Sequence, residues 1–131
     1  MNGYCKGRRA ILTSTTKGLK PWQAQVATVA KIAQVEFLEK GVPVIVDMLF
    51  YFERPKSHFG TGRNAGILKK KAPEYHTQKP DKDKLGRAVH DALTGIAYHD
   101  DSQVIGGKVF KYWTDEIMCD QGVLITIRKV I

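Results

Sequence analysis

Apolar residues recur along the chain at spacings that predict two amphipathic helices. From Trp22 to Glu39 they lie three or four residues apart, which places them on one face of a helix. Pro21 suits the start of this helix, and Gly41 is typical of a helix end. A second helix is expected from about Asp81 to Ile96, where the apolar positions repeat with the same period.

Three further segments have the composition of strands. Val44 to Phe52 is apolar apart from Asp47, and we expect it to be buried on much of both faces. Val104 to Trp113 and Val123 to Val130 predict two more strands, with a turn at residues 114–116. Residues 1–14 show no clear periodicity. The order of these elements predicts an α+β fold, in which two main helices pack on a small mixed β-sheet.

A long connection, about residues 53–80, separates the first expected strand from the second helix. It is rich in glycine, proline and cations and has little periodicity. An irregular connection of this length is unusual within a small domain and tends to be functional or disordered. The whole chain of 131 residues has the size of a single domain, which we expect to span residues 1–131.

The formal charge of +8 favours a polyanionic partner, with nucleic acid ahead of a membrane. The segment from Arg54 to Lys84 carries nine of the cations and only three acids. A solvated charged face is the ordinary explanation of such a run. Here the basic run leads directly into a group of aspartates, and this juxtaposition makes a functional surface a stronger interpretation than the run alone would.

Other classes of protein lack support. No apolar run of about 18 residues is present to span a membrane, and no apolar secretory signal is found at the N-terminus. Cys5 and Cys119 belong to no metal-binding motif, which predicts a reduced, cytoplasmic chain; a single disulfide between them is the alternative. The glycine-rich stretch at residues 60–66 has no nucleotide-binding spacing, and the four histidines have no zinc spacing.

Five aspartates fall within 21 positions: Asp81, Asp83, Asp91, Asp100 and Asp101. Carboxylates brought together repel one another, and a divalent cation such as Mg²⁺ removes that cost. If the strand after Asp101 runs beside the start of the second helix, the two outer pairs meet. The alternative is structural: helix caps, a turn, and surface ion pairs of Arg87 with Asp83 and Asp91.

The order of residues in this region resembles a known family. The stretch KPDKDKLGR at residues 79–87 resembles the KPDxDNLxK motif of the RusA family of Holliday junction resolvases. Residues 91–95 (DALTG) and 98–104 (YHDDSQV) resemble that family's DAL(N/T)G…DDsQV signature, at the same spacing from the first motif. Residues 59–77 are similar to the basic loop of its phage-type, prophage-borne branch. The resemblance covers roughly Val44 to the C-terminus.

The resemblance implies a homodimeric, Mg²⁺-dependent endonuclease that nicks branched DNA such as a four-way junction, in DNA recombination and repair. Mn²⁺ is expected to substitute for Mg²⁺. Matching positions suggest Asp81, Asp83 and Asp101 as catalytic metal ligands, with Asp100 beside them and Arg87 as a catalytic cation. The residues expected to bind backbone phosphates are Arg63, Lys69, Lys70, Lys71, Lys79 and Lys84.

Two positions depart from the family motif. Lys84 stands where the motif has asparagine, and Arg87 stands where it has lysine. Arginine and lysine are not interchangeable where a point charge or proton donor is needed. Two alternatives therefore remain open: a catalytically impaired protein that binds branched DNA, and a nuclease that acts on other branched DNA. An RNA-binding module has little support, because Trp22 and Trp113 are expected in the core.

Overall fold

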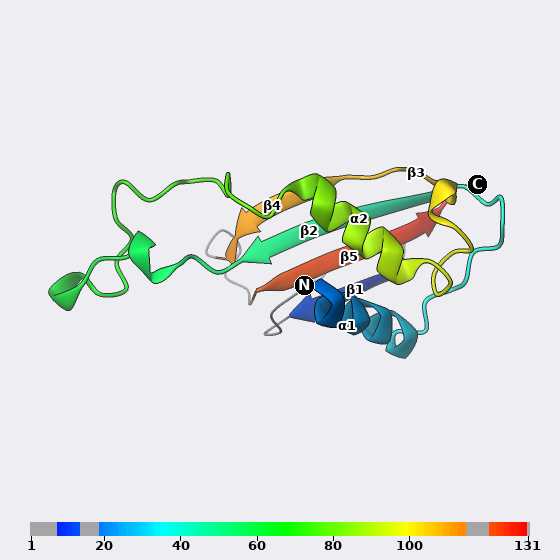
Figure 1. Ribbon diagram of the computed structural model, residues 1–131, viewed down its shortest axis with the longest axis horizontal. Helices are drawn as coiled ribbons and strands as arrows, with labels where there is room; N and C mark the ends of the chain where they lie inside the picture. Colours follow the sequence, from blue (N-terminus) through cyan, green and yellow to red (C-terminus); the bar gives the residue numbers. More distant parts are fainter. Residues whose placement is uncertain (1–7, 14–18, 115–120, 131) are drawn as a thin grey trace.

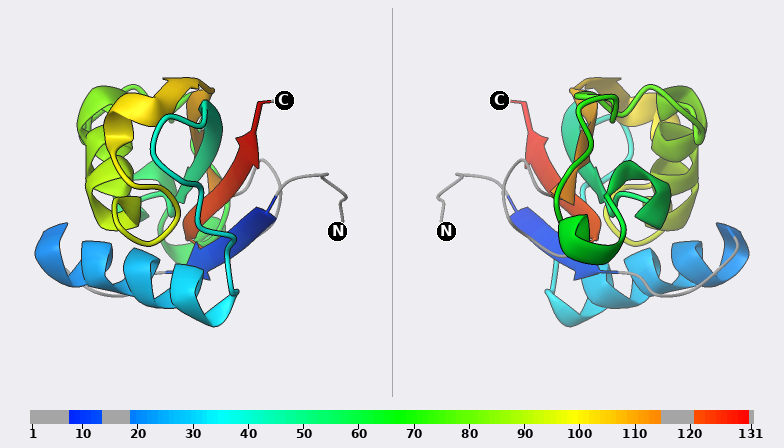
Figure 2. Two further views of the ribbon diagram at one scale, coloured as in Figure 1. Left: turned by 90° about the vertical axis from the view of Figure 1, so that its right-hand side faces the viewer. Right: turned by 90° about the vertical axis from the view of Figure 1, so that its left-hand side faces the viewer.

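The structure is a computed structural model that describes residues 8–13, 19–114 and 121–130. Its centre is a five-stranded mixed sheet in the order β1-β5-β2-β3, in which β4 also pairs with β2. Both helices lie on one face of this sheet (Figures 1 and 2). The elements are β1 (Arg8–Thr13), α1 (Leu19–Ile32), β2 (Val44–Phe52), α2 (Lys82–Leu93), β3 (Val104–Gly106), β4 (Val109–Trp113) and β5 (Gly122–Lys129).

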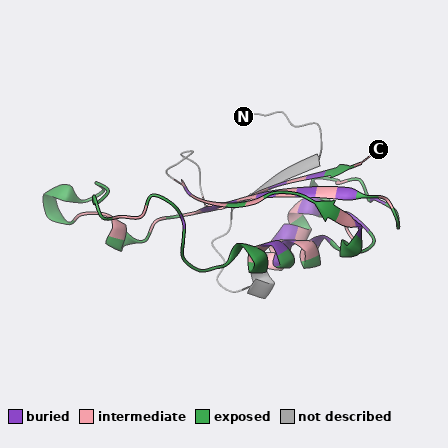
Figure 3. Cartoon of the chain, turned by 90° about the horizontal axis from the view of Figure 1, so that it is seen from above, coloured by how far each residue is buried: buried purple, intermediate pink, exposed green. Residues whose placement is uncertain are grey.

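Strand β2 organises the sheet. It pairs antiparallel with β5, where Val46 lies opposite Ile127, and parallel with β4, where Leu49 lies opposite Phe110. Parallel neighbours need a long crossover, and the segment that contains α2 provides it. Burial alternates along most of β2, so one face packs beneath the helices and the other is only partly covered. Figure 3 shows the sheet edge-on, with the helices on one side of it.

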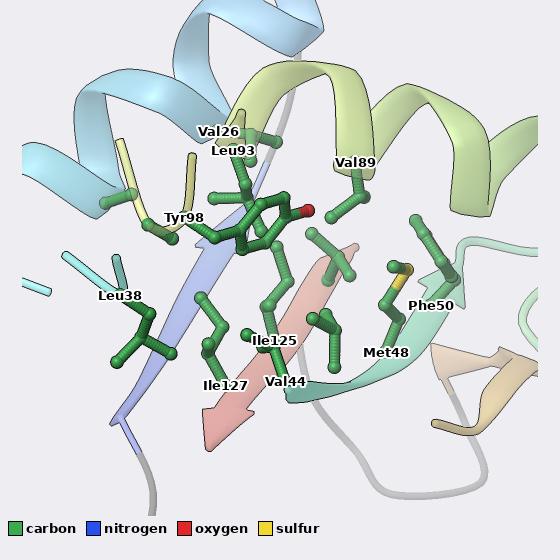
Figure 4. Close-up of a cluster of buried hydrophobic side chains, with 14 residues drawn as sticks. Val26, Leu38, Val44, Met48, Phe50, Val89, Leu93, Tyr98, Ile125 and Ile127 are labelled. Carbon is green, nitrogen blue, oxygen red and sulfur yellow. The ribbon is translucent and has the colours of Figure 1, made fainter. Parts of the chain in front are cut away.

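The core lies between this sheet face and the two helices. Val26 of α1 and Val89 and Leu93 of α2 pack over buried side chains of β2 and β5, as Figure 4 shows. Tyr98, which follows α2, is completely buried in the same cluster. Gln23 of α1 also donates a 3.0 Å hydrogen bond from Nε2 to the Ala88 carbonyl of α2. The helical spacing of the apolar residues thus produces one continuous core.

The predicted α+β fold is confirmed, but the first helix is shorter than expected. It ends at Ile32 rather than at Gly41, because Gln34 adopts a positive φ of 54°. The Val35 amide then bonds back to the Ala30 carbonyl at 3.3 Å and the Gln34 amide to the Lys31 carbonyl at 3.0 Å. These bonds are those of a left-handed helix termination that glycine usually makes. Gln34 carries no signal for it in the sequence.

The strand expected from Val104 to Trp113 is broken in two. Gly107 has φ 140°, and a Cβ there would lie 1.8 Å from the carbonyl oxygen of Val46. The chain therefore leaves β2 after β3 and returns to it as β4. The structure also contains β1, which the sequence pattern did not reveal. Most of the turn expected at residues 114–116 lies outside the described residues.

Residues 56–75 form an arm that projects from one end of the domain (Figure 1). The arm is not structureless, since it contains short 3₁₀ turns at Lys56–His58 and Gly62–Asn64. It leaves the sheet after β2 and returns to the start of α2. The connection between β2 and α2 thus has defined local structure.

Candidate active site

Asp81 and Asp83 lie at the beginning of α2. Asp81 is the N-cap residue, with φ −72° and ψ 146°, and its side chain makes no capping hydrogen bond. Asp83 lies in the first turn, and both residues are exposed. Aspartate at an N-cap ordinarily accepts a hydrogen bond from the helix. Here the Asp81 carboxylate is not used in this way, so its oxygens remain available to a ligand.

The same helix end carries positive charge. Lys82 and Lys84 are exposed on either side of Asp83. The first amide groups of a helix also point outwards with a partial positive charge, and this attracts phosphate. Hard carboxylate oxygens beside a phosphate-binding helix end are a donor set that fits Mg²⁺, which is usually held by a few carboxylates and substrate phosphate.

A groove of about 880 Å³ lies beside this helix end. One side is formed by residues 76–79 with Asp81 and Lys82, and the other by residues 109–111 of β4. Lys79 and Lys82 contribute cations to the groove. It is thus an open groove whose lining combines three lysines, including Lys111, and one carboxylate, Asp81, with uncharged side chains.

Lys111 fixes the segment that precedes Asp81. Its Nζ donates hydrogen bonds to the carbonyl oxygens of Gln78 at 2.8 Å and Pro80 at 3.0 Å. Hydrogen bonds from a charged donor are stronger than those between neutral groups. The position of Asp81 relative to β4 therefore depends on Lys111. The sequence contained no signal for this role beyond a lysine within a strand.

Beneath the groove lies a cluster of aromatic side chains. His76 is 6% exposed, stacks on Phe52 at 4.3 Å between ring centroids, and lies 4.5 Å from the Trp113 ring. Burial, followed by the nearby charge of Lys111, lowers the pKa of His76 below its usual value. Arg54 covers the Trp113 ring at 4.9 Å and donates to the Pro73 carbonyl at 2.6 Å. Trp113 is 1% exposed, so the prediction that it is a core residue is confirmed.

Asp100 and Asp101 lie at a short 3₁₀ helix, Asp101–Gln103, and not within a strand. Asp100 caps it, accepting hydrogen bonds from the backbone amide and the hydroxyl of Ser102. These bonds hold the pKa of Asp100 below its usual value. The buried Gln103 donates from Nε2 to the carbonyls of Glu39 at 2.7 Å and Val42 at 3.0 Å, which fixes this turn against the loop after α1.

One chain does not bring the two aspartate pairs together. The 12 residues of α2 span about 18 Å, and the turn that carries Asp101 lies beyond its C-terminal end (Figure 1). Asp101 is close enough to His90, in the second half of α2, to oppose the lowering of the His90 pKa by burial. Within the described ranges, no group of three histidine, cysteine, aspartate or glutamate residues is arranged to hold a metal ion.

The predicted cations are exposed and distributed over three places. Arg63, Lys69, Lys70 and Lys71 lie on the arm, Lys79 lies in the groove, and Lys84 and Arg87 lie on α2. The ion pairs expected of Arg87 with Asp83 and Asp91 do not form in the part of the chain that the structure describes. Arg87 is therefore available to a ligand one turn from Asp83.

An α+β domain with exposed carboxylates at a helix start, beside a cationic groove and arm, has the chemistry of a protein that processes nucleic acid. The family model described as Endodeoxyribonuclease RusA matches residues 2–128. The chain is also 37% identical over 100 residues to YqaN, an uncharacterized protein of Bacillus subtilis (strain 168), which covers 74% of this chain and 67% of YqaN. The chain belongs to the RusA endodeoxyribonuclease family, a family of nucleases that bind branched DNA. No described helix is long and apolar enough to cross a membrane.

Proposed function

We propose that this protein is a Mg²⁺-dependent endonuclease that resolves four-way DNA junctions by paired nicks, in DNA recombination and repair. The family supports an endonuclease that acts on branched DNA. The observation that carries the metal proposal is the Asp81 carboxylate, which takes no part in capping α2 although it occupies the N-cap. With Asp83 it supplies hard oxygen ligands at a helix end that attracts phosphate.

The described side chains suggest a division of labour. Asp81 and Asp83 hold Mg²⁺ or Mn²⁺, and Lys79 and Lys84 contact the DNA backbone. A bound divalent ion supplies charge stabilisation at the phosphodiester and lowers the pKa of a water. Arg87, which is exposed and unpaired within the described ranges, stabilises the negative charge that develops on the phosphate.

We further propose that a second copy of the chain completes each site. The short 3₁₀ helix that begins at Asp101, with Asp100 as its cap, lies beyond the C-terminal end of α2, whereas Asp81 and Asp83 lie at the start of α2. In a two-fold dimer, Asp101 of one copy can approach the Asp81 and Asp83 of the other. Because the two copies contribute to each other in the same way, the dimer contains two equivalent sites. Two such sites match a four-way junction, which is itself approximately two-fold symmetric. Paired nicking then follows from the symmetry of the assembly.

The test uses a labelled four-way junction incubated with Mg²⁺ or Mn²⁺. Wild-type protein is expected to nick it, and Asp83→Asn is expected to lose activity by about 100-fold or more, the size of effect seen when a group that stabilises transition-state charge is removed. Asp91→Asn is the matched control, because Asp91 is an exposed aspartate further along the same helix. Undiminished nicking by Asp83→Asn overturns the site assignment.

Lys84 and Arg87 decide between this proposal and its alternatives. An impaired binding protein would retain salt-sensitive junction binding and yield no product with either metal. Replacing these residues with asparagine and lysine, as in the family motif, would then create activity. Cleavage rates of flap, nicked and linear substrates are compared with that of the four-way junction. Faster cleavage of another branched substrate would identify a nuclease for that DNA.

A further inference from the structure

The arm, residues 56–75, has a defined shape. Its two sides are joined by backbone hydrogen bonds from Gly60 to the Ile67 carbonyl and from Lys69 to the His58 carbonyl, both 2.9 Å. A Cβ at Gly60 would lie 2.5 Å from the Cβ of Asn64, so this closure requires glycine. The projection therefore has a defined backbone conformation in the single chain.

The base of the arm is held against the domain. Arg54 reaches the Pro73 carbonyl, and the His58 ring meets the Trp113 ring edge-on at 5.1 Å between centroids. The arm projects from the end of the molecule at which α2 begins (Figure 1). A DNA strand held at Asp81 and Asp83 would therefore leave the site beside the arm.

The outer part of the arm combines positive charge with exposed apolar side chains. Between residues 56 and 75 there are five cations and one acid. Ile67 is 58% exposed and Leu68 is 41% exposed, and both lie between Arg63 and the three lysines at residues 69–71. Large apolar side chains flanked by cations are what DNA-bending proteins insert between base steps while the cations hold the backbone.

We propose that the arm is a wedge that opens the branch point, with Ile67 and Leu68 inserted between base pairs while Arg63 and Lys70 contact the flanking phosphates. The proposal rests on the branched-DNA substrate proposed above. A branch point is the favourable place for insertion, because base stacking is already interrupted there and less unstacking free energy is needed. Charge complementarity favours DNA as the occupant over a second copy of this cationic chain.

The test places 2-aminopurine, whose fluorescence rises when a base unstacks, beside the branch point. It is carried out in EDTA, so that binding is measured without cleavage. Wild-type protein is expected to raise the fluorescence by about twofold or more, and the Ile67→Ala/Leu68→Ala variant to leave it near the value of free DNA. A linear duplex of the same sequence should show little change with either protein.

Two control variants separate insertion from attraction. Ile105→Ala removes a similarly exposed isoleucine, 64% exposed, from β3 away from the arm, and should leave the fluorescence rise unchanged. Lys70→Ala should weaken binding and reduce its salt dependence, while the bound complex keeps the rise. The proposal is overturned if the double variant raises the fluorescence as wild type does, or if its main effect is dissociation of a dimer in sedimentation. Failure of the wild type to cut DNA would instead overturn the proposed nuclease function.

Discussion

At the scale of single residues, Lys111 links the sheet to the candidate active site. Its two hydrogen bonds, to the Gln78 and Pro80 carbonyls, fix the segment that leads into Asp81. Because carboxylate ligands must be held closely for metal and phosphate to be oriented together, the effect of Lys111 on catalysis should exceed its effect on DNA binding.

We therefore predict that Lys111→Met lowers the rate of junction nicking by about 10- to 100-fold, because small displacements of catalytic groups have effects of that size. Junction affinity in EDTA should change little, and Lys111→Arg should recover part of the rate. Lys108→Met, an exposed lysine just before the same strand, is the control. Equal losses of affinity and rate in Lys111→Met would show that this lysine serves mainly to bind DNA.

His76 and His90 make stability depend on pH. Burial is the main cause that lowers both pKa values below that of an unfolded histidine, 6.5. The unfolded chain then binds more protons than the folded one below pH 6.5. Stability is accordingly full above that pH and falls as the pH decreases toward the lower, folded-state values.

The expected result is a lower melting temperature at pH 5.5 than at pH 7.5, with a smaller difference in His76→Phe. Phenylalanine retains the stacking on Phe52 and removes the titrating group. His99→Gln, an exposed substitution, should keep the wild-type difference. Thermal unfolding followed by circular dichroism measures all three proteins. An unchanged difference in His76→Phe would contradict this origin of the pH dependence.

At the scale of elements, two glycines have opposite structural requirements. Gly86 is buried within α2, and a Cβ there would lie 3.7 Å from Cγ2 of Val109, an ordinary contact distance. Gly107 separates β3 from β4 and leaves no space for a Cβ beside the Val46 carbonyl. The fold therefore has room for a side chain at residue 86, whereas it requires glycine at residue 107.

Gly86→Ala is predicted to raise the free energy of unfolding by about 0.5–1 kcal/mol, because alanine restricts the unfolded chain and favours a helix. Gly107→Ala should lower it by about 3 kcal/mol, because the clash with the Val46 carbonyl forces the link between β3 and β4 away from β2. Urea unfolding of the two variants provides the comparison. A destabilised Gly86→Ala would show that α2 packs more closely on β4 than this spacing allows.

The elements with strong periodicity were predictable from the sequence. The β2 prediction matches the structure at both ends, and the second helix was placed correctly except for its last turn. The end of α1 was not predictable, because a glutamine takes the left-handed conformation at Gln34. Strand β1 was missed because its stability comes from pairing with β5, which its own sequence does not reveal. The periodicity of apolar residues thus predicts a helix or strand correctly only where contacts with distant parts of the chain do not decide its limits.

At the scale of the whole molecule, the sequence placed Asp81 and Asp83 at the start of the second helix but did not predict that Asp100 and Asp101 lie apart from them. The spacing of the motifs allowed Asp81 and Asp83 to meet Asp100 and Asp101, and the direction of α2 carries the second pair to its far end. Direction depends on the parallel pairing of β2 with β3 and β4, which is a property of the fold. Lys111 was also unpredictable, since its partners are backbone atoms more than 30 residues away.

The shared active site proposed above takes Asp81 and Asp83 from one chain and Asp101 from another, and a mixed dimer tests it. Asp83→Asn and Asp101→Asn chains, each inactive as a homodimer, are to be co-expressed with different affinity tags and purified as a mixed dimer. One of its two sites then contains only wild-type residues, while the other carries both substitutions. The mixed dimer is expected to nick a four-way junction at about half the wild-type rate, with single rather than paired cuts. A mixed dimer as inactive as either homodimer, beside active wild-type protein, would contradict it.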